Sequence, residues 1–201
     1  MPAFELVLVV AFAQTALAQS LSDLRTLYDA GQYQQAIATA SSAQAGGEQP
    51  RVTYLVAQSH QKLRQMNEAR EVYGRLAARG DGDPWRDVGR SAVALLASDA
   101  AGAVDAANQA VARGGSIPET HYQRGLALSV RQDMTNAAAA FERAVELDPS
   151  WADAHYYAGL AYSRVKRFDM TASHFATFLK LAPQSPSRPE VQSIMRTLGG
   201  K

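Results

Sequence analysis

The sequence predicts an all-α protein built from stacked helical hairpins, and three observations lead to this prediction. The 201-residue chain is rich in Ala and in unbranched polar residues, which favour helix over strand. The stretch HYYAGLAYSRVKRFDMTASHF, residues 155–175, has a looser copy, HYQRGLALSVRQDMTNAAAAF, at residues 121–141. Pro or Gly recurs near the end of each such unit, where these residues stop a helix and turn the chain. Together these features predict a solenoid of repeated helix-turn-helix units.

The repeat extends beyond these two copies when positions 34 residues apart are compared. One column holds small residues, Ala57, Ser91, Gly125 and Gly159, and a second holds Ala69, Ala103, Ala137 and Thr171. A third column holds Tyr73, Ala107, Phe141 and Phe175, three of which are large. Small residues let two helices approach closely, and larger ones fill the space beside them. One unit cannot bury its apolar face alone, so the units must stack to form a core.

We divide the array, residues 19–185, into five units at 19–49, 50–83, 84–117, 118–151 and 152–185. The first unit matches the pattern least well, and its turn is expected at Gly31. Asp83 before Pro84 predicts the N-cap of the helix that opens the third unit. Residues 186–201 are expected to form a capping helix and tail that cover the last unit, with a capping box between Ser187 and Glu190.

The N-terminus predicts a signal peptide over residues 1–18, cut after Ala18. The apolar run at residues 6–13 is followed by Ala-Leu-Ala at 16–18, which fits the small-x-small cleavage rule. The run is too short to cross a bilayer comfortably and no second one follows, so no membrane span is expected. Glu5 stands where a basic residue is usual, which leaves a buried N-terminal helix or a misplaced start site as alternatives. A cleaved leader implies a periplasmic or secreted protein.

Composition excludes several classes of chemistry. The net charge is +1 with acids and bases interspersed, so no basic face for nucleic acid is expected. The absence of Cys excludes disulfides, thiolate metal sites and Cys nucleophiles. No nucleophile-elbow, dinucleotide-binding, Walker or metalloprotease motif is present, so we expect no enzyme and no catalytic residues.

No metal or cofactor is expected either. His121 and His155 share a column, but no third ligand lies near them in the sequence. His60 and His174 are isolated and are expected on helix faces. The turn GDGDP, residues 80–84, lacks the downstream ligands of a calcium loop.

These features resemble the tetratricopeptide repeat, whose signature has Gly and an aromatic in the first helix, then Ala-x-x-x-Phe and a closing Pro. The residues that match are Gly125, Ala137, Phe141 and Pro149 in one unit and Gly159, Tyr162, Phe175 and Pro183 in the next. Thr171 replaces the usual Ala. The resemblance covers about residues 21–184 with about five repeats. It implies a right-handed α-α superhelix whose first helices line a concave groove.

The column beside the small residues predicts which side chains face this groove. The candidate partner-binding residues are Tyr54, Gln58, Lys62, Tyr122, Gln123, Leu126, Tyr156, Tyr157, Leu160 and Arg164. Tyrosine offers a large rigid apolar body with a hydrogen-bonding tip, which suits an extended or helical peptide segment. The alternative is that these tyrosines pack between neighbouring repeats.

We therefore expect an exported, non-catalytic scaffold or adaptor that binds a protein or peptide segment in its concave groove. The resemblance suggests envelope assembly or secretion as the setting. The alternative is a cytoplasmic regulatory or cochaperone-like module. A cochaperone that clamps a carboxylate would need more cations in the groove than Lys62 and Arg164 provide. An enzyme with an atypical site is a third, weaker option.

Overall fold

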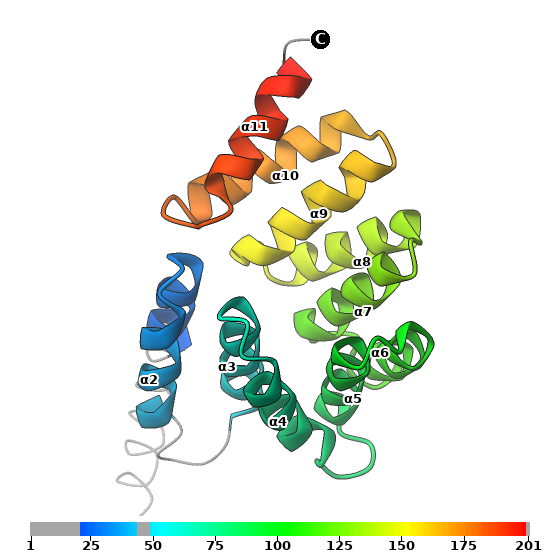
Figure 1. Ribbon diagram of the computed structural model, residues 1–201. Helices are drawn as coiled ribbons and strands as arrows, with labels where there is room; N and C mark the ends of the chain where they lie inside the picture. Colours follow the sequence, from blue (N-terminus) through cyan, green and yellow to red (C-terminus); the bar gives the residue numbers. More distant parts are fainter. Residues whose placement is uncertain (1–20, 44–48, 200–201) are drawn as a thin grey trace, which may run out of the picture.

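The computed structural model describes residues 21–43 and 49–199, and in these ranges the chain forms helices and turns without strands (Figure 1). A short helix over residues 21–29 and α2 (Tyr33–Ala43) make the first hairpin. The predicted signal peptide, residues 1–18, lies outside the described residues.

Four further hairpins follow in chain order. They are α3 (Pro50–Lys62) with α4 (Met66–Ala77), α5 (Pro84–Leu96) with α6 (Ala100–Gly114), α7 (Pro118–Val130) with α8 (Met134–Leu147), and α9 (Ala152–Arg164) with α10 (Phe168–Leu181). The last helix, α11 (Arg188–Gly199), packs on the fifth hairpin. Figure 1 shows the helices stacked consecutively into a curved array. The predicted all-α superhelix of hairpins with a C-terminal capping helix is confirmed.

Local signals explain where several helices begin. Proline occupies the first helical position of α3, α5 and α7, where its missing N–H leaves no bond unmade. As predicted, Asp83 caps α5, because its carboxylate accepts a hydrogen bond from the Trp85 backbone N–H at 2.9 Å. The predicted capping box of α11 is wrong. The Ser187 N–H donates to Ser185 Oγ, and the Glu190 carboxylate faces α9, where it accepts from the Tyr156 hydroxyl.

The turn inside each hairpin uses one residue in the left-handed region. In the first hairpin this residue is Gly31, with φ of 78°. In the other four it is Arg64, Ser98, Gln132 or Lys166, each with φ between 61° and 63°. Left-handed backbone is strained for residues that carry a Cβ. All five turns therefore reverse the chain in the same way, although only the first has a glycine at this position.

The small column is the place where the second helix of a hairpin approaches the first. A Cβ atom on Gly125 would lie 2.6 Å from the Phe141 ring, and one on Gly159 would lie 2.5 Å from the Phe175 ring. Ala57 and Ser91, in the same column, are fully buried. One apolar cluster runs continuously from Tyr54 to Ala161, and smaller clusters lie at each end.

The superhelix is curved tightly enough for its first and last hairpins to meet. The Arg25 guanidinium lies 2.6 Å from the Asp148 carboxylate, and the Tyr28 hydroxyl donates to Asp153 Oδ2 at 2.8 Å. A Cβ atom on Gly31 would lie 2.6 Å from Pro186, in the loop between α10 and α11. Figure 1 shows the blue first hairpin reaching this orange loop. The concave side is therefore bounded at both ends by the chain itself.

Candidate partner-binding site

A cavity of about 710 Å³ lies on the concave side of the superhelix. The first helix of each of the five hairpins contributes to its wall. The lining residues are Tyr28, Gln58, Gln61, Lys62, Leu95, Leu96, Tyr122, Leu126, Ser129, Val130, Gln132 and Tyr157. The lining combines leucines and Val130 with glutamines, Ser129, Lys62 and three tyrosines. Concave apolar surface with a few polar groups is typical of a binding site.

Half of the residues predicted to form the groove line this cavity. They are Gln58, Lys62, Tyr122, Leu126 and Tyr157; the others, Tyr54, Gln123, Tyr156, Leu160 and Arg164, lie outside its lining. Gln61, Leu95 and Ser129 also line the cavity, and the prediction missed them. They are spaced 34 residues apart and precede the column of Lys62 by one residue, so comparing the neighbouring columns as well would have identified them. Tyr28 belongs to the first unit, where the repeat pattern is weakest, and carries no local signal of its role.

Tyr54 and Gln123 are closed off from solvent, each about 1% exposed. The Tyr54 hydroxyl donates to Gln123 Oε1 at 2.8 Å, and Gln123 Nε2 donates to Ser91 Oγ at 3.2 Å. This chain of bonds joins α3, α7 and α5. Alternate first helices touch because the superhelix is tight, so these side chains pack between repeats. A partner could reach them only if the array opened.

Tyr122 and Tyr156 are also mainly packing residues in this structure. The Tyr122 ring stacks on Trp151 with centroids 4.4 Å apart, and burial raises the pKa of its phenol well above the usual value. The Tyr156 hydroxyl donates to Glu190 Oε2 at 2.9 Å, so α11 covers part of the predicted groove. Leu160 packs against the same terminal cluster, whereas Arg164 is exposed.

Gln58 carries an unpaired acceptor in the cavity wall. Its side chain is 5% exposed, and its Oε1 has no hydrogen-bond partner among the described residues. A buried acceptor without a donor destabilises a protein by about 1–3 kcal/mol. An N–H group of a bound segment would satisfy this oxygen once the Gln58 side chain turned toward the cavity, because the oxygen itself is buried.

Lys62 places a fixed positive charge at the edge of the cavity. Its Nζ lies 3.3 Å from Asp153 Oδ2 and 5.7 and 5.8 Å from the ring centroids of Tyr28 and Tyr157. Burial acts to lower the pKa of Lys62, but Asp153 and the nearby phenols outweigh it, so the pKa is raised. The ammonium is thus held by this chain's own groups.

Comparison with protein families identifies the repeat. A family model described as tetratricopeptide repeat matches residues 118–150, which contain the α7–α8 hairpin. A second model, described as anaphase-promoting complex, cyclosome, subunit 3, matches residues 9–76. The chain belongs to the tetratricopeptide-repeat family. None of the curated proteins compared with the chain matches it.

Solved structures show the same tetratricopeptide fold. TTC0263, a thermophilic tetratricopeptide protein of Thermus thermophilus, is 19% identical, with a TM-score of 0.62 over 90% of this chain and 98% of that one. The tetratricopeptide domain of Arabidopsis OM64 is 18% identical, with a TM-score of 0.55 over 59% and 98%. The TPR2AB domain of yeast Sti1, in complex with pHSP90, is 14% identical, with a TM-score of 0.54 over 91% and 85%.

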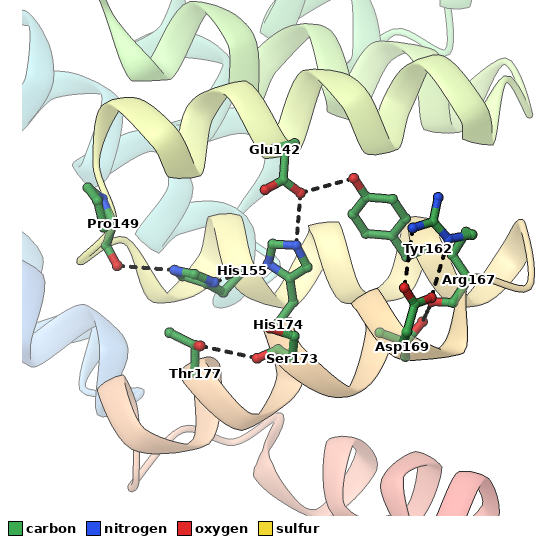
Figure 2. Close-up of polar contacts among 10 residues, drawn as sticks. Glu142, Pro149, His155, Tyr162, Arg167, Asp169, Ser173, His174 and Thr177 are labelled. Carbon is green, nitrogen blue, oxygen red and sulfur yellow. Dashed lines mark hydrogen bonds and ion pairs between the residues drawn. The ribbon is translucent and has the colours of Figure 1, made fainter.

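A second polar cluster lies between the last two tetratricopeptide units (Figure 2), and none of its residues lines the cavity. His155 Nε2 lies 3.1 Å from the Pro149 carbonyl, and His155 Nδ1 lies 3.2 Å from His174 Nδ1. His174 Nε2 lies 2.9 Å from Glu142 Oε2, which also accepts from the Tyr162 hydroxyl at 3.0 Å. The expectation that His174 is an isolated helix-face residue is therefore wrong. Its contact is His155, which lies 19 positions earlier on α9, and no local sequence pattern indicates this pairing.

The hydrogen positions in this cluster follow from its acceptors. A carbonyl oxygen can only accept, so His155 Nε2 carries a hydrogen, and one hydrogen lies between His155 Nδ1 and His174 Nδ1. One further hydrogen must then lie between His174 Nε2 and the Glu142 carboxyl group. The cluster ties α8, α9 and α10 together.

The shared His column has a structural role in both units. His121 Nε2 contacts the Gly115 carbonyl at 2.9 Å, as His155 Nε2 contacts that of Pro149, six residues upstream in each case. Burial lowers the pKa of both imidazoles. Within the described ranges no group of three or more His, Cys, Asp or Glu side chains could hold a metal ion. No helix in the same ranges is long and apolar enough to cross a membrane.

Proposed function

We propose that this protein is an exported, non-catalytic tetratricopeptide-repeat scaffold that binds a protein or peptide segment on its concave side. The observation that carries the proposal is the cavity of about 710 Å³ with the unpaired Gln58 oxygen in its wall. The structure of yeast Sti1, which has the same fold, is a complex with pHSP90. That complex supports a ligand-holding role for this architecture.

The cavity wall indicates the chemistry of the segment. Leu95, Leu96 and Leu126 would receive one or two apolar side chains, and Gln58 would accept a hydrogen bond from a backbone N–H. Lys62 alone is cationic among the residues lining this cavity, and Asp153 already neutralises it. A carboxylate clamp of the cochaperone type is therefore disfavoured, and an apolar segment is preferred.

Site-specific photocrosslinking tests the location. Val130 lines the cavity and is 54% exposed, whereas Met66, 45% exposed, lies outside its lining, so the two positions form a matched pair. A photoreactive residue at position 130 should form a discrete adduct in a native envelope fraction, and one at position 66 should not. Adducts at position 66 alone, or equal adducts at both, would contradict a concave site.

Export is tested separately, through the N-terminus of the mature chain. Cleavage after Ala18 makes Gln19 the first residue, which mass spectrometry of the fractionated protein would detect. Recovery in the periplasm or medium with this terminus would support roles in envelope assembly or secretion. An intact leader on a cytoplasmic protein would favour the alternative of a cytoplasmic regulatory or cochaperone-like binding module.

A further inference from the structure

The helix at residues 21–29, in the first hairpin, packs against the other end of the superhelix, near the start of α9. Arg25 pairs with Asp148 at 2.6 Å and lies over the Trp151 ring at 5.4 Å. Three residues later Tyr28, 3% exposed, donates to Asp153 Oδ2 at 2.8 Å. A cation and a tyrosine on one face of a short helix thus meet two carboxylates and an indole at the start of α9.

The contact between residues 21–29 and the start of α9 also forms part of the candidate binding site. Tyr28 lines the cavity, and Lys62, another lining residue, shares the Asp153 carboxylate with it. The first hairpin therefore supplies one wall of the cavity. If residues 21–29 left α9, the cavity would open along that side.

The two sides of the helix make contacts of different kinds. Toward the second hairpin it contributes to an apolar cluster, whose buried members are Leu24, Tyr28, Ala36, Ala40, Val52 and Leu55. Toward α9 the contacts named above are polar, and the side chains of Arg25 and Asp148 are each about one fifth exposed. The contact with α9 thus consists mainly of two side-chain bonds, Arg25 to Asp148 and Tyr28 to Asp153, and another cation and tyrosine that form the same two bonds can replace it.

We propose that residues 21–29 form an exchangeable clasp, which a partner helix carrying a cation three residues before a tyrosine displaces from Asp148, Trp151 and Asp153. The displaced clasp would admit the partner to the cavity, so the clasp rests on the proposed function. Such a partner would present the same two groups as Arg25 and Tyr28, which occupy this place in the structure.

A peptide of residues 21–43 of this chain, carrying a fluorescent label, is the probe. It should bind the full-length protein weakly, because the clasp already occupies the site. Tyr28→Phe removes one hydrogen bond to a carboxylate from the clasp and leaves the acceptor intact. The peptide should then bind roughly tenfold more tightly. Adding Asp153→Ala to Tyr28→Phe should remove that gain, since this variant has no acceptor for the tyrosine of the peptide either.

Asp169→Asn serves as the matched control. It removes an acid from an ion pair with Arg167 whose side chains are both more than half exposed. This variant should leave peptide affinity unchanged. Equal affinity for the wild-type and Tyr28→Phe proteins would overturn the clasp, and so would a gain that survives Asp153→Ala.

A distance measurement reports the opening directly. Because the chain has no Cys, spin labels at Thr26→Cys and Gln184→Cys, both exposed positions, would mark the two ends alone. We expect one short distance that lengthens at saturating peptide. A distance that does not change would overturn the clasp, and so would light scattering that shows the first hairpin exchanged between two copies. Neither result bears on crosslinking at position 130, which tests the proposed function independently.

Discussion

Tyr28 and Asp153 lie 125 residues apart in the chain, yet the Tyr28 hydroxyl donates a hydrogen bond of 2.8 Å to Asp153 Oδ2. The same carboxylate oxygen lies 3.3 Å from Lys62 Nζ. Asp153 is 7% exposed, and its two donors come from the first and second hairpins. This nearly buried carboxylate thus connects the first two hairpins to the fifth.

The stability of the closed superhelix should depend on pH through Asp29, which follows Tyr28 in the sequence. Burial, followed by repulsion from Asp153, raises the pKa of Asp29 from 3.8 to about 7, although Arg25 and Lys62 act to lower it. Between these values the folded state keeps a proton that the unfolded state loses, so stability falls as pH rises through that window. Asp29→Asn should remove this fall. Urea unfolding at pH 5, 6, 7 and 8 checks it, and parallel profiles for the variant and the wild type would contradict the assignment.

Gly125→Ala should destabilise the fourth hairpin. A Cβ there would lie 2.6 Å from the Phe141 ring, which is fully buried and cannot move aside freely. Overpacking of this kind costs about 1–3 kcal/mol, beyond the roughly 1 kcal/mol that alanine gains in helix propensity. Gly74→Ala, inside α4 with open space around the new Cβ, is the control and should stabilise the protein. Thermal unfolding that moves in the same direction for both variants would contradict this packing.

The hairpin packing could be predicted from sequence because its signals are local to each unit. Gly125 and Phe141 are 16 residues apart, and the pair recurs one repeat later as Gly159 and Phe175. The repeat period therefore indicates both where the chain turns within a hairpin and which two residues pack together. The proline at the start of α5 and its cap Asp83 are adjacent. For these features, spacing and residue type were sufficient.

The closed form of the site could not be predicted in this way. Tyr54 is buried by Gln123, which is two hairpins away, and this contact depends on the curvature accumulated over the units between them. Small differences in helix packing at each step decide whether alternate helices touch. The column pattern predicts that Tyr54 lies on the concave side of α3. It does not determine how wide the groove between the first helices is.

Ser98→Gly should stabilise the protein by about 1 kcal/mol. Ser98 is exposed and has φ of 61°, where an L residue with a Cβ is strained and glycine is not. Gly31→Ala places a Cβ at the same turn position of the first hairpin and should destabilise the protein for two reasons, the φ of 78° and a contact of 2.6 Å with Pro186. Chemical denaturation of both variants measures the two free energies. A loss of stability in Ser98→Gly would mean that other contacts, rather than backbone strain, dominate this turn.

Tyr122→Ala should distinguish packing from partner contact at the centre of the array. The ring is 1% exposed, stacks on Trp151 and lies 5.7 Å from Phe141, so its removal would leave a cavity in the core. Truncation of a buried aromatic costs about 3–5 kcal/mol, which would lower the unfolding midpoint strongly. Arg164→Ala, an exposed position from the same predicted groove, should change stability by less than about 0.5 kcal/mol. If Tyr122→Ala left the midpoint unchanged and abolished crosslinking at position 130, the ring would instead contact the partner, as the sequence first predicted.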